Sequence, residues 1–345
     1  MTEISPLDSK RCLVTGGAGY LGRHLVSALR AKGCPVHVLD REPSPGPQPD
    51  VQWFQGDVRS EDDVRAACQG VDTIFHTAAV IEALTHARRS VATAIRAINV
   101  GGTQNVIRMA QQSGVRRLVH TSSITTSFCV NGSGGDETSP YSTSRDLYTA
   151  TKIEAERAVL QANGQGGLLT CAIRPGGIYG PGERLTYGRL VRALKMGVPL
   201  VVFGDGKARL DYVYIDNLVD GELRAAERLT EGSPVCGQAY FLSDETPINA
   251  GQFSIELVRN MGLHRKLIRV PDSVAIALGT AWERVYQIFG APKPAFTVAN
   301  VKLCDIDHYF SIDKAKRDLG YAPLVDTEEG LRRTAVEARQ YYDSL

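Results

Sequence analysis

The sequence lacks most of the features that mark specialised classes of protein. Its 7 cysteines never lie closer than 22 residues apart, so there is no CxxC pair and no metal-ligand spacing. An odd and scattered set of cysteines predicts reduced thiols and no metal site. Lys plus Arg total 39 and Asp plus Glu total 38, so the basic excess typical of nucleic-acid-binding proteins is missing. We therefore expect no nucleic-acid partner.

Long apolar runs are also missing. No run approaches the ~18 residues that a membrane-spanning helix needs. The opening segment MTEISPLDSKR has no apolar core of the kind that signal peptides carry. We expect a cytoplasmic protein without a spanning segment.

The first half of the chain alternates short apolar segments with longer periodic ones. Strands are expected at 11–14, 35–40, 51–57, 71–79, 115–123 and 168–175, and helices at 21–33, 61–69, 90–113 and 147–163. This alternation predicts an α/β protein with a Rossmann-type, doubly wound parallel sheet. Beyond residue 180, proline-punctuated shorter elements indicate a smaller mixed α/β substrate-binding region, 181–345, with segments that return to the sheet of 1–180.

A glycine pattern follows the first expected strand. Gly16, Gly19 and Gly22 form GxxGxxG at the opening of a helix. Glycine lets the backbone approach a pyrophosphate, and the helix N-terminus supplies N–H groups and partial positive charge. Asp40 ends the second strand, where an acid binds ribose hydroxyls and repels a 2′-phosphate. NAD is therefore favoured over NADP, with Arg41 expected to be a solvated loop charge.

Two further strand ends carry residues suited to a dinucleotide. Asp57 follows the third strand, where it can bind the adenine amino group. It could instead cap the next helix, although Ser60 is better placed for that role. Thr77, Ala78 and Ala79 follow the fourth strand and are small, as a flat cofactor crossing the strand ends requires.

A second set of residues suits hydride transfer. Tyr148 and Lys152 form YxxxK on an expected helix, and the i, i+4 spacing places both on one face. The ammonium should lower the pKa of the phenol and so let it act as a base. Ser122 and Ser123 end the fifth strand, at the sheet edge where doubly wound folds bind ligands.

Taken together, these motifs resemble those of the extended short-chain dehydrogenases/reductases. TGGAGYLG, Asp40, GDV, HTAA, NVGGTQN, HTSS, YTATK and RPGGIYGPG carry the resemblance, which runs from about residue 10 to 335. ARLDYVYIDNLVDG, GQAYFLSDETPIN and YFSIDKAKRDLGYAPL are similar to the 3β-hydroxysteroid dehydrogenase/isomerase family, which includes sterol 4α-carboxylate 3-dehydrogenases. GGDETSPYS and LLTCAIRP resemble actinobacterial members that act on 3β-hydroxysteroids.

The resemblance implies a role for each matching residue. Tyr148 would take the hydroxyl proton while C3 gives hydride to the nicotinamide of NAD. Lys152 would hold the nicotinamide ribose, and Ser123 would bind the developing carbonyl oxygen. Further cofactor positions implied by the motifs are Tyr20, Leu21, Val58, Asn99, Thr121, Pro175, Gly177 and Ile178. For Asn99 a purely structural hydrogen bond is equally compatible with the pattern.

The family leaves the second half of the reaction open. Steroid members can also shift a Δ5 double bond to Δ4, which needs another acid/base. Asp211, Tyr212 and Glu82 are candidates only because they could face the substrate, and a structural polar role is favoured for each.

The substrate is open as well. A 4α-carboxysterol dehydrogenase would need a basic side chain over the carboxylate, for which Arg89, Arg184 and Arg209 are candidates. A 2-alkyl-3-oxoalkanoate reductase would carry the same motifs. A non-catalytic NAD-binding scaffold on the same fold would keep the glycine loop without using the hydride-transfer residues.

The remaining expectations concern one helix, the oligomeric state and two single residues. The segment 271–290 matches a membrane-spanning stretch of mammalian members, but Glu283 and Arg284 interrupt it. It should lie on a membrane, cover an apolar substrate or pack on the core. Relatives often pair through helices equivalent to 90–113 and 147–163, so a homodimer is expected by analogy. His76 is expected to be a packed histidine, and Cys129 a free thiol.

Overall fold

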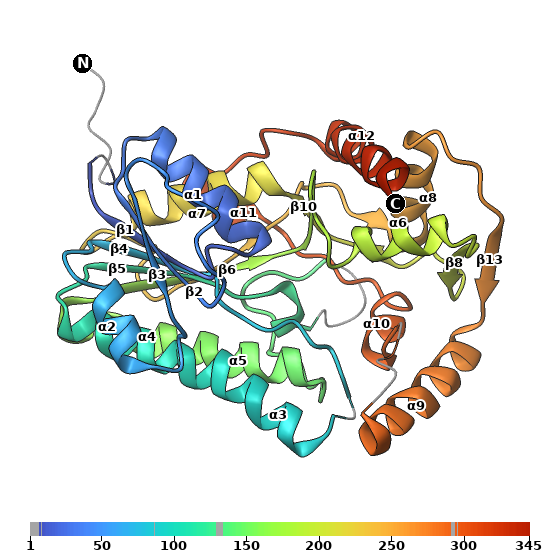
Figure 1. The fold of residues 1–345 in the computed structure, drawn as a ribbon, viewed down its shortest axis with the longest axis horizontal. Helices are drawn as coiled ribbons and strands as arrows, with labels where there is room; N and C mark the ends of the chain where they lie inside the picture. The colour runs from blue at the N-terminus through green and yellow to red at the C-terminus, as the bar shows by residue number, and fades with distance from the viewer. Residues whose placement is uncertain (1–6, 8, 86, 129–133, 291–293, 295) are drawn as a thin grey trace.

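A seven-stranded parallel sheet forms the centre of the protein (Figure 1). The computed structural model describes residues 7–345 except 8, 86, 129–133, 291–293 and 295. The strands follow the order β11-β6-β5-β4-β1-β2-β3. Their bounds are β1 Cys12–Thr15, β2 Val36–Asp40, β3 Val51–Gln55, β4 Thr73–His76, β5 Arg117–Thr121, β6 Leu169–Pro175 and β11 Ala239–Leu242. The order reverses beside β1, which is where doubly wound sheets bind ligands at the carboxyl ends of their strands.

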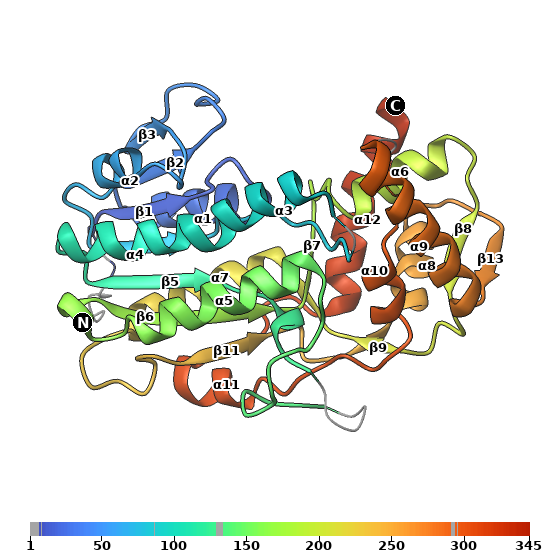
Figure 2. The ribbon, with the colours of Figure 1, turned by 90° about the horizontal axis from the view of Figure 1, so that it is seen from below.

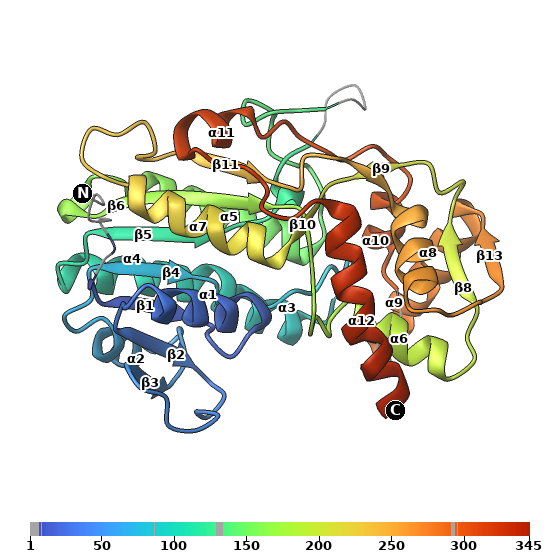
Figure 3. The ribbon, with the colours of Figure 1, turned by 90° about the horizontal axis from the view of Figure 1, so that it is seen from above.

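Helices cover both faces of this sheet. Figure 2 shows α2 (Glu61–Ala67), α4 (Thr103–Gln112) and α5 (Leu147–Gln161) on one side. Figure 3 shows α1 (Tyr20–Ala31), α7 (Ile215–Arg228) and α11 (Asp313–Leu319) on the other. Alternate residues of a strand enter the two apolar layers, as Leu13 and Val14 of β1 do. The expected Rossmann-type fold is confirmed.

The helix expected over 90–113 is not a single α-helix. Residues Arg89–Arg96 form α3, Ala97–Gly102 form a π-helical turn η1, and α4 follows directly. A π turn inserts extra backbone into a helix and is often found at functional sites. Here it contains Asn99, one of the residues singled out from the sequence.

The region after residue 180 is built from short elements, as the prolines indicated. Among the described residues, this region and the strand β7 just before it form three two-stranded sheets, and a group of its helices lies at one end of the molecule (Figure 1). The sheets pair β7 (Gly177–Tyr179) with β10 (Tyr212–Tyr214), β9 (Arg209–Leu210) with β12 (Ile248–Asn249), and β8 (Leu200–Phe203) with β13 (Leu267–Val270). The helices are α6 (Tyr187–Lys195), α8 (Ala250–Asn260), α9 (Asp272–Phe289), α10 (Val298–Leu303) and α12 (Thr327–Ser344). From this same half, α7, β11 and α11 return to the central sheet.

The expected helical segment 271–290 forms α9. Glu283 is buried on this helix, and its Oε1 accepts a hydrogen bond of 2.8 Å from the Val298 N–H at the start of α10. This charged residue therefore fastens α9 to its neighbour. Over the described part of the chain, no helix combines the length and apolarity that crossing a bilayer requires.

Candidate active site

The glycine loop joins β1 to α1 and is shaped by contacts that exclude side chains. Gly16 has φ +75°, and a Cβ there would lie 2.9 Å from the Ala78 backbone. A Cβ on Gly22 would lie 2.1 Å from the Gly16 carbonyl oxygen. Within the described residues, no side chain caps α1 and its first turn has no acid. The helix N-terminus can therefore receive an anion.

Asp40 lies against this loop at the carboxyl end of β2. Its Oδ2 accepts a hydrogen bond of 2.9 Å from the Ala18 N–H, and its Oδ1 accepts one of 3.0 Å from the Glu42 N–H. The carboxylate is half-buried beside the glycines, as expected for a group that reads a ribose. Arg41 is exposed, in agreement with a solvated loop charge.

Other expected cofactor residues are held by contacts within the protein. The Thr77 hydroxyl donates to the Thr15 carbonyl over 2.8 Å, and Ala78 and Ala79 follow half-buried. Val58 is buried, and its carbonyl accepts a hydrogen bond of 2.9 Å from the Asn105 side chain.

Asp57 and Tyr20 are held by contacts inside the protein. Asp57 pairs with Arg59 over 2.6 Å, and this hydrogen bond lowers the pKa of the Asp57 carboxyl. A role for Asp57 as the helix cap is excluded, because Ser60 caps α2 by accepting from the Asp63 N–H. Tyr20 turns its hydroxyl under Gly180, and the neighbouring Leu21 side chain lies in the apolar core.

Lys152 and Tyr148 lie on the face of α5 that meets the end of β5. Lys152 is buried, and its ammonium donates a hydrogen bond to the Thr121 carbonyl. Burial lowers the pKa of Lys152 to about 8, while the charges of Glu156 and Glu222 raise it.

The pKa of Tyr148 moves in the direction opposite to the sequence expectation. Burial raises the pKa of Tyr148 to about 12, whereas a hydrogen bond with Ser123 lowers it. The expected lowering of the Tyr148 pKa by Lys152 is therefore not seen, and burial favours the neutral phenol.

The two serines after β5 take different directions. Ser123 caps the short helix η2 (Ile124–Thr126) by accepting from the Thr125 N–H over 3.2 Å, and its hydroxyl also meets Tyr148. Ser122 turns the other way and donates to the Glu156 Oε2 over 2.6 Å. Ser123, rather than Ser122, is thus the serine that forms a hydrogen bond with Tyr148 beyond the carboxyl end of β5.

Comparison with known proteins identifies the family of the chain. The family described as the 3-beta hydroxysteroid dehydrogenase/isomerase family matches residues 13–271. The chain belongs to this family.

Curated relatives match almost the whole chain. A "3 beta-hydroxysteroid dehydrogenase/Delta 5-->4-isomerase" of Mycobacterium tuberculosis is 42% identical over 97% of this chain and 91% of its own length. A "3-beta-hydroxysteroid dehydrogenase" of Mycolicibacterium neoaurum is 39% identical over 98% of this chain and 93% of its own. Among solved structures, MoeE5 in complex with UDP-glucose and NAD has a TM-score of 0.75 at 24% identity, covering 96% of this chain and 99% of its own. That likeness establishes the fold alone.

Two buried residues near the site, Glu156 and Glu222, were not predicted from the sequence. Glu156 accepts bonds from Arg174 of 2.6 and 3.0 Å, from Ser122, and from the Tyr141 hydroxyl over 2.8 Å. It follows Lys152 by four residues, so the pattern YxxxKxxxE could have indicated it. Glu222 of α7 is fully buried beside Thr121, and no sequence spacing points to it.

Asn99 and His76 hold the helices that carry the site. The Asn99 amide donates to the Val80 carbonyl over 3.1 Å and to the Thr151 hydroxyl over 3.0 Å, while its oxygen accepts from the Val80 N–H. Asn99 therefore has a structural role, one of the two that its pattern allowed. His76 bonds to Thr15 and Thr103, and burial lowers the pKa of its ring to about 3.

The segment after β6 packs against the candidates for isomerisation. The Gly177 N–H donates to the Asp211 carbonyl over 2.8 Å, with Pro175 buried and Ile178 half-buried beside it. Asp211 accepts a hydrogen bond of 2.7 Å from the Phe310 N–H, and burial raises the pKa of its carboxyl to about 7.

The other two candidates differ in their surroundings. Tyr212 stacks on Phe253 with ring centroids 3.9 Å apart, so its ring belongs to the core. Glu82 is half-buried in the segment between β4 and α3. The Tyr212 ring therefore has a structural role. The Oδ2 of Asp211 has one as well, since it accepts the hydrogen bond from the Phe310 N–H.

The arginines considered for a substrate carboxylate differ in their surroundings as well. Arg184 pairs with Glu337, and Arg209 pairs with Asp307 over 2.6 Å. Arg89 lies exposed at the start of α3. Two of the three candidates are thus already engaged with carboxylates of the protein.

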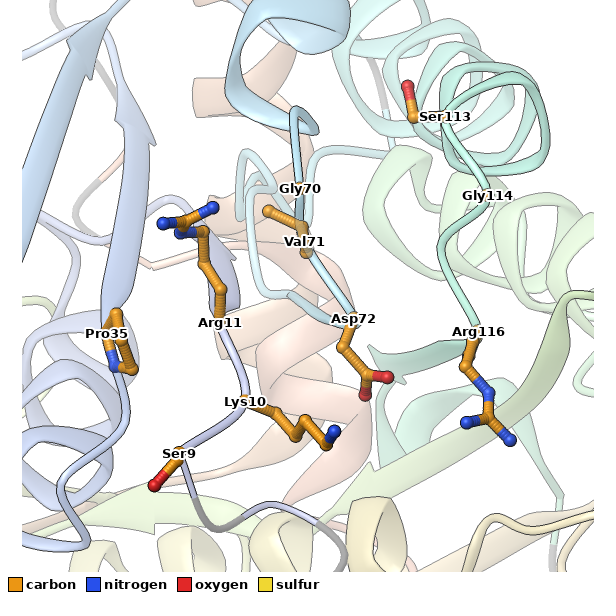
Figure 4. A pocket seen from close by; sticks show the side chains of 10 residues that line it. All are labelled: Ser9, Lys10, Arg11, Pro35, Gly70, Val71, Asp72, Ser113, Gly114 and Arg116. Atoms are coloured by element: carbon orange, nitrogen blue, oxygen red, sulfur yellow. The ribbon is translucent and has the colours of Figure 1, made fainter.

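A pocket of about 480 Å³ lies at the opposite edge of the sheet. Figure 4 shows Arg11, Asp72 and Arg116 around it. These residues precede β1, β4 and β5, so the pocket opens at the amino ends of the strands. Cys129 lies outside the described residues, and the six described cysteines are free thiols.

Proposed function

We propose that this protein oxidises the 3β-hydroxyl of a steroid or sterol to a ketone with NAD⁺. The observation that carries the proposal is that the hydrogen-bonded Ser123 and Tyr148 lie at the end of β5, where Lys152 also binds through the Thr121 carbonyl. The family membership and the names of the relatives support the substrate class.

The residues present fit a dinucleotide. Side chains at Gly16 and Gly22 would close the loop, and α1 begins without a side-chain cap. Asp40 beside the loop would hold the adenosine ribose. NAD⁺, when bound, accepts the hydride. The negative charge of Asp40 disfavours the 2′-phosphate of NADP⁺.

The chain's own groups move the proton and orient the alcohol. Tyr148 in its phenolate form takes the hydroxyl proton, and the Ser123 hydroxyl donates a hydrogen bond to the oxygen that becomes the carbonyl. Lys152 fixes the ribose side and favours the phenolate. The pKa of Tyr148 is about 12. Oxidation therefore requires that nearby positive charge lower this pKa, so that the phenolate forms.

A spectrophotometric assay tests the proposal. Purified protein is given NAD⁺ or NADP⁺ with a Δ5-3β-hydroxysteroid, its 3α epimer, cholesterol, a 4α-carboxysterol or a 2-alkyl-3-hydroxy acid, and NADH absorbance is followed. We expect turnover of 3β-hydroxysteroids with NAD⁺. An enone absorbance would add isomerisation. Turnover of the hydroxy acid alone would refute the steroid assignment.

A variant separates catalysis from binding. Tyr148→Phe should lower kcat by roughly 10²–10⁴-fold, the range for general acid–base catalysis, and leave NAD⁺ affinity by calorimetry nearly unchanged. Undiminished turnover would show that another group is the base. Turnover absent in the parent protein, with NAD⁺ still bound, would favour a non-catalytic scaffold.

We also propose a homodimer in the cytoplasm. The helices α3, α4 and α5 lie side by side on one face of the sheet (Figure 2), as a four-helix interface would need. Light scattering after size exclusion tests the mass, and cell fractionation tests the compartment.

A further inference from the structure

Glu222 is a buried acid directly beneath the end of β5. It lies on α7, with 0% of its surface exposed. Its Oε1 accepts a hydrogen bond of 2.6 Å from the Thr121 hydroxyl. Its Oε2 is also buried and has no hydrogen-bond partner among the described residues. An unsatisfied carboxylate oxygen inside a protein is costly, so this side chain needs an explanation beyond one hydrogen bond.

Thr121 links this acid to Lys152. The Thr121 hydroxyl faces α7 on one side of the sheet, while its carbonyl accepts the hydrogen bond from the Lys152 ammonium of α5 on the other side. One strand-end residue therefore contacts both a buried anion and a buried cation that come from opposite faces of the sheet.

The second carboxylate near Lys152 has a cation of its own. Glu156 is neutralised by Arg174 through two hydrogen bonds, so that pair presents little net charge. Glu222 forms no ion pair of 4 Å or less with any described residue, and its charge and that of Lys152 stabilise each other. Burial raises the pKa of Glu222 to about 7, and the Thr121 bond and Lys152 lower it.

The other titratable groups around the pair are uncharged. Burial lowers the pKa values of His76 and His120, which face Lys152 from β4 and β5, so both rings are neutral. Burial raises the pKa of the Cys171 thiol, which faces Glu222 from β6. Above its pKa of about 7, Glu222 is therefore a buried carboxylate without an ion-pair partner among the described residues, and Thr121 links it to Lys152.

We propose that Glu222 is the counter-ion of Lys152, a positioning residue that keeps the ammonium charged and, through Thr121, in place. Its effect on turnover rests on the proposed function, whereas its effect on the charge of Lys152 exists in the ligand-free protein. Because Lys152 must be cationic to favour the Tyr148 phenolate, Glu222 sets the alkaline limit of the reaction.

The test compares Glu222→Gln with Glu227→Gln. Glutamine keeps an acceptor for the Thr121 hydroxyl and removes the charge. Glu227 lies on the same helix, at the surface, paired with Lys32 over 3.0 Å. The pKa of Lys152 is measured by NMR of the lysine side chains in ligand-free protein, with Lys152→Arg for assignment. We expect Glu222→Gln to lower it by about one unit, as for loss of a nearby opposite charge. The same value in both variants would overturn the proposal.

A reciprocal measurement does not depend on folding of the Glu222 variant. In Lys152→Gln, the pKa of Glu222, followed by carboxyl ¹³C NMR, should rise because linkage between two charges is mutual. An unchanged Glu222 titration would overturn the proposal as well.

The pH profile of kcat/KM then connects the pair to function. Glu222→Gln should lose activity at a lower alkaline pH than Glu227→Gln, with Glu222→Asp closer to the parent because it keeps the charge. If the pH profiles of Glu222→Gln and Glu227→Gln coincide, the proposed effect of Glu222 on the alkaline limit of the reaction is wrong. A protein without any steroid turnover would refute the proposed function while the NMR result still decides the pairing.

Discussion

Breaking the buried ion pair between Glu156 and Arg174 should destabilise the fold strongly. The two side chains have exposed fractions of 0% and 5% and are joined by bonds of 2.6 and 3.0 Å. Removing one partner of such a pair typically costs ~3–5 kcal/mol, because the other charge stays buried. Glu156→Gln still accepts one hydrogen bond, so we expect a loss near the lower end, about 3 kcal/mol. For a chain of 345 residues, ~1.4 °C per kcal/mol is expected, so Tm should fall by roughly 4 °C.

Urea and thermal unfolding at pH 7 measure this loss. The matched control is Glu154→Gln on the same helix, a surface partner of Arg96 whose removal should cost at most ~1 kcal/mol. Replacing both partners, as in E156M/R174M, should cost less than the sum of the single variants, since no lone charge remains. If Glu156→Gln unfolds within about 1 kcal/mol of the control, the pair does not stabilise the fold as reasoned.

The pH dependence of this difference has a definite sign. Burial raises the pKa of Glu156, but the bonds from Arg174 outweigh it and hold the pKa below its usual value. The stabilisation is therefore present above the unfolded-state pKa and is lost as the pH falls through the folded-state pKa. The gap between parent and Glu156→Gln should be widest at neutral pH and narrow in acid.

Three further predictions concern the cofactor loop and Lys152. Gly22→Ala should weaken NAD⁺ binding about tenfold or more in calorimetry, because overpacking costs ~1–3 kcal/mol and the new Cβ would meet backbone at 2.1 Å; unchanged affinity would mean that the loop does not hold the cofactor. Asp40→Asn should narrow the preference for NAD⁺ over NADP⁺ in kcat/KM, and an unaltered ratio would remove Asp40 from that choice. Lys152→Met should stabilise the protein in urea unfolding, since burial lowers the pKa of Lys152 to about 8. Between pH 8 and ~10.4, the ordinary lysine value, the unfolded state binds more protons than the folded state. The gain in stability should therefore be full below pH 8 and shrink as the pH rises towards ~10.4. A gain that is constant with pH would contradict the reasoning.

Local patterns predicted the parts of the site that depend on local geometry. The glycine loop, YxxxK and the choice of Ser123 are set by one turn, one helix face and one strand end, and the parallel sheet then brings them together. The family assignment and the fold are confirmed. The roles of the individual residues in binding and catalysis remain predictions.

Residues that depend on long-range contacts were missed or misjudged. Glu222 meets Thr121 only because α7 packs under β5, about a hundred residues away in the chain. Arg184 and Arg209 have partners far along the sequence, which no local pattern reveals. The pKa of Tyr148 was misjudged for the same reason, because burial is a property of the assembled fold.

The place of β11 has a consequence for how the chain folds during synthesis. β6 pairs with β5 on one edge and with β11 on the other, and β11 is formed by Ala239–Leu242. Until those residues have left the ribosome, the nascent sheet ends in an apolar strand with unpaired backbone groups. Exposed edges of this kind invite pairing with other chains. A gene fragment ending at residue 180 would therefore yield an aggregation-prone protein.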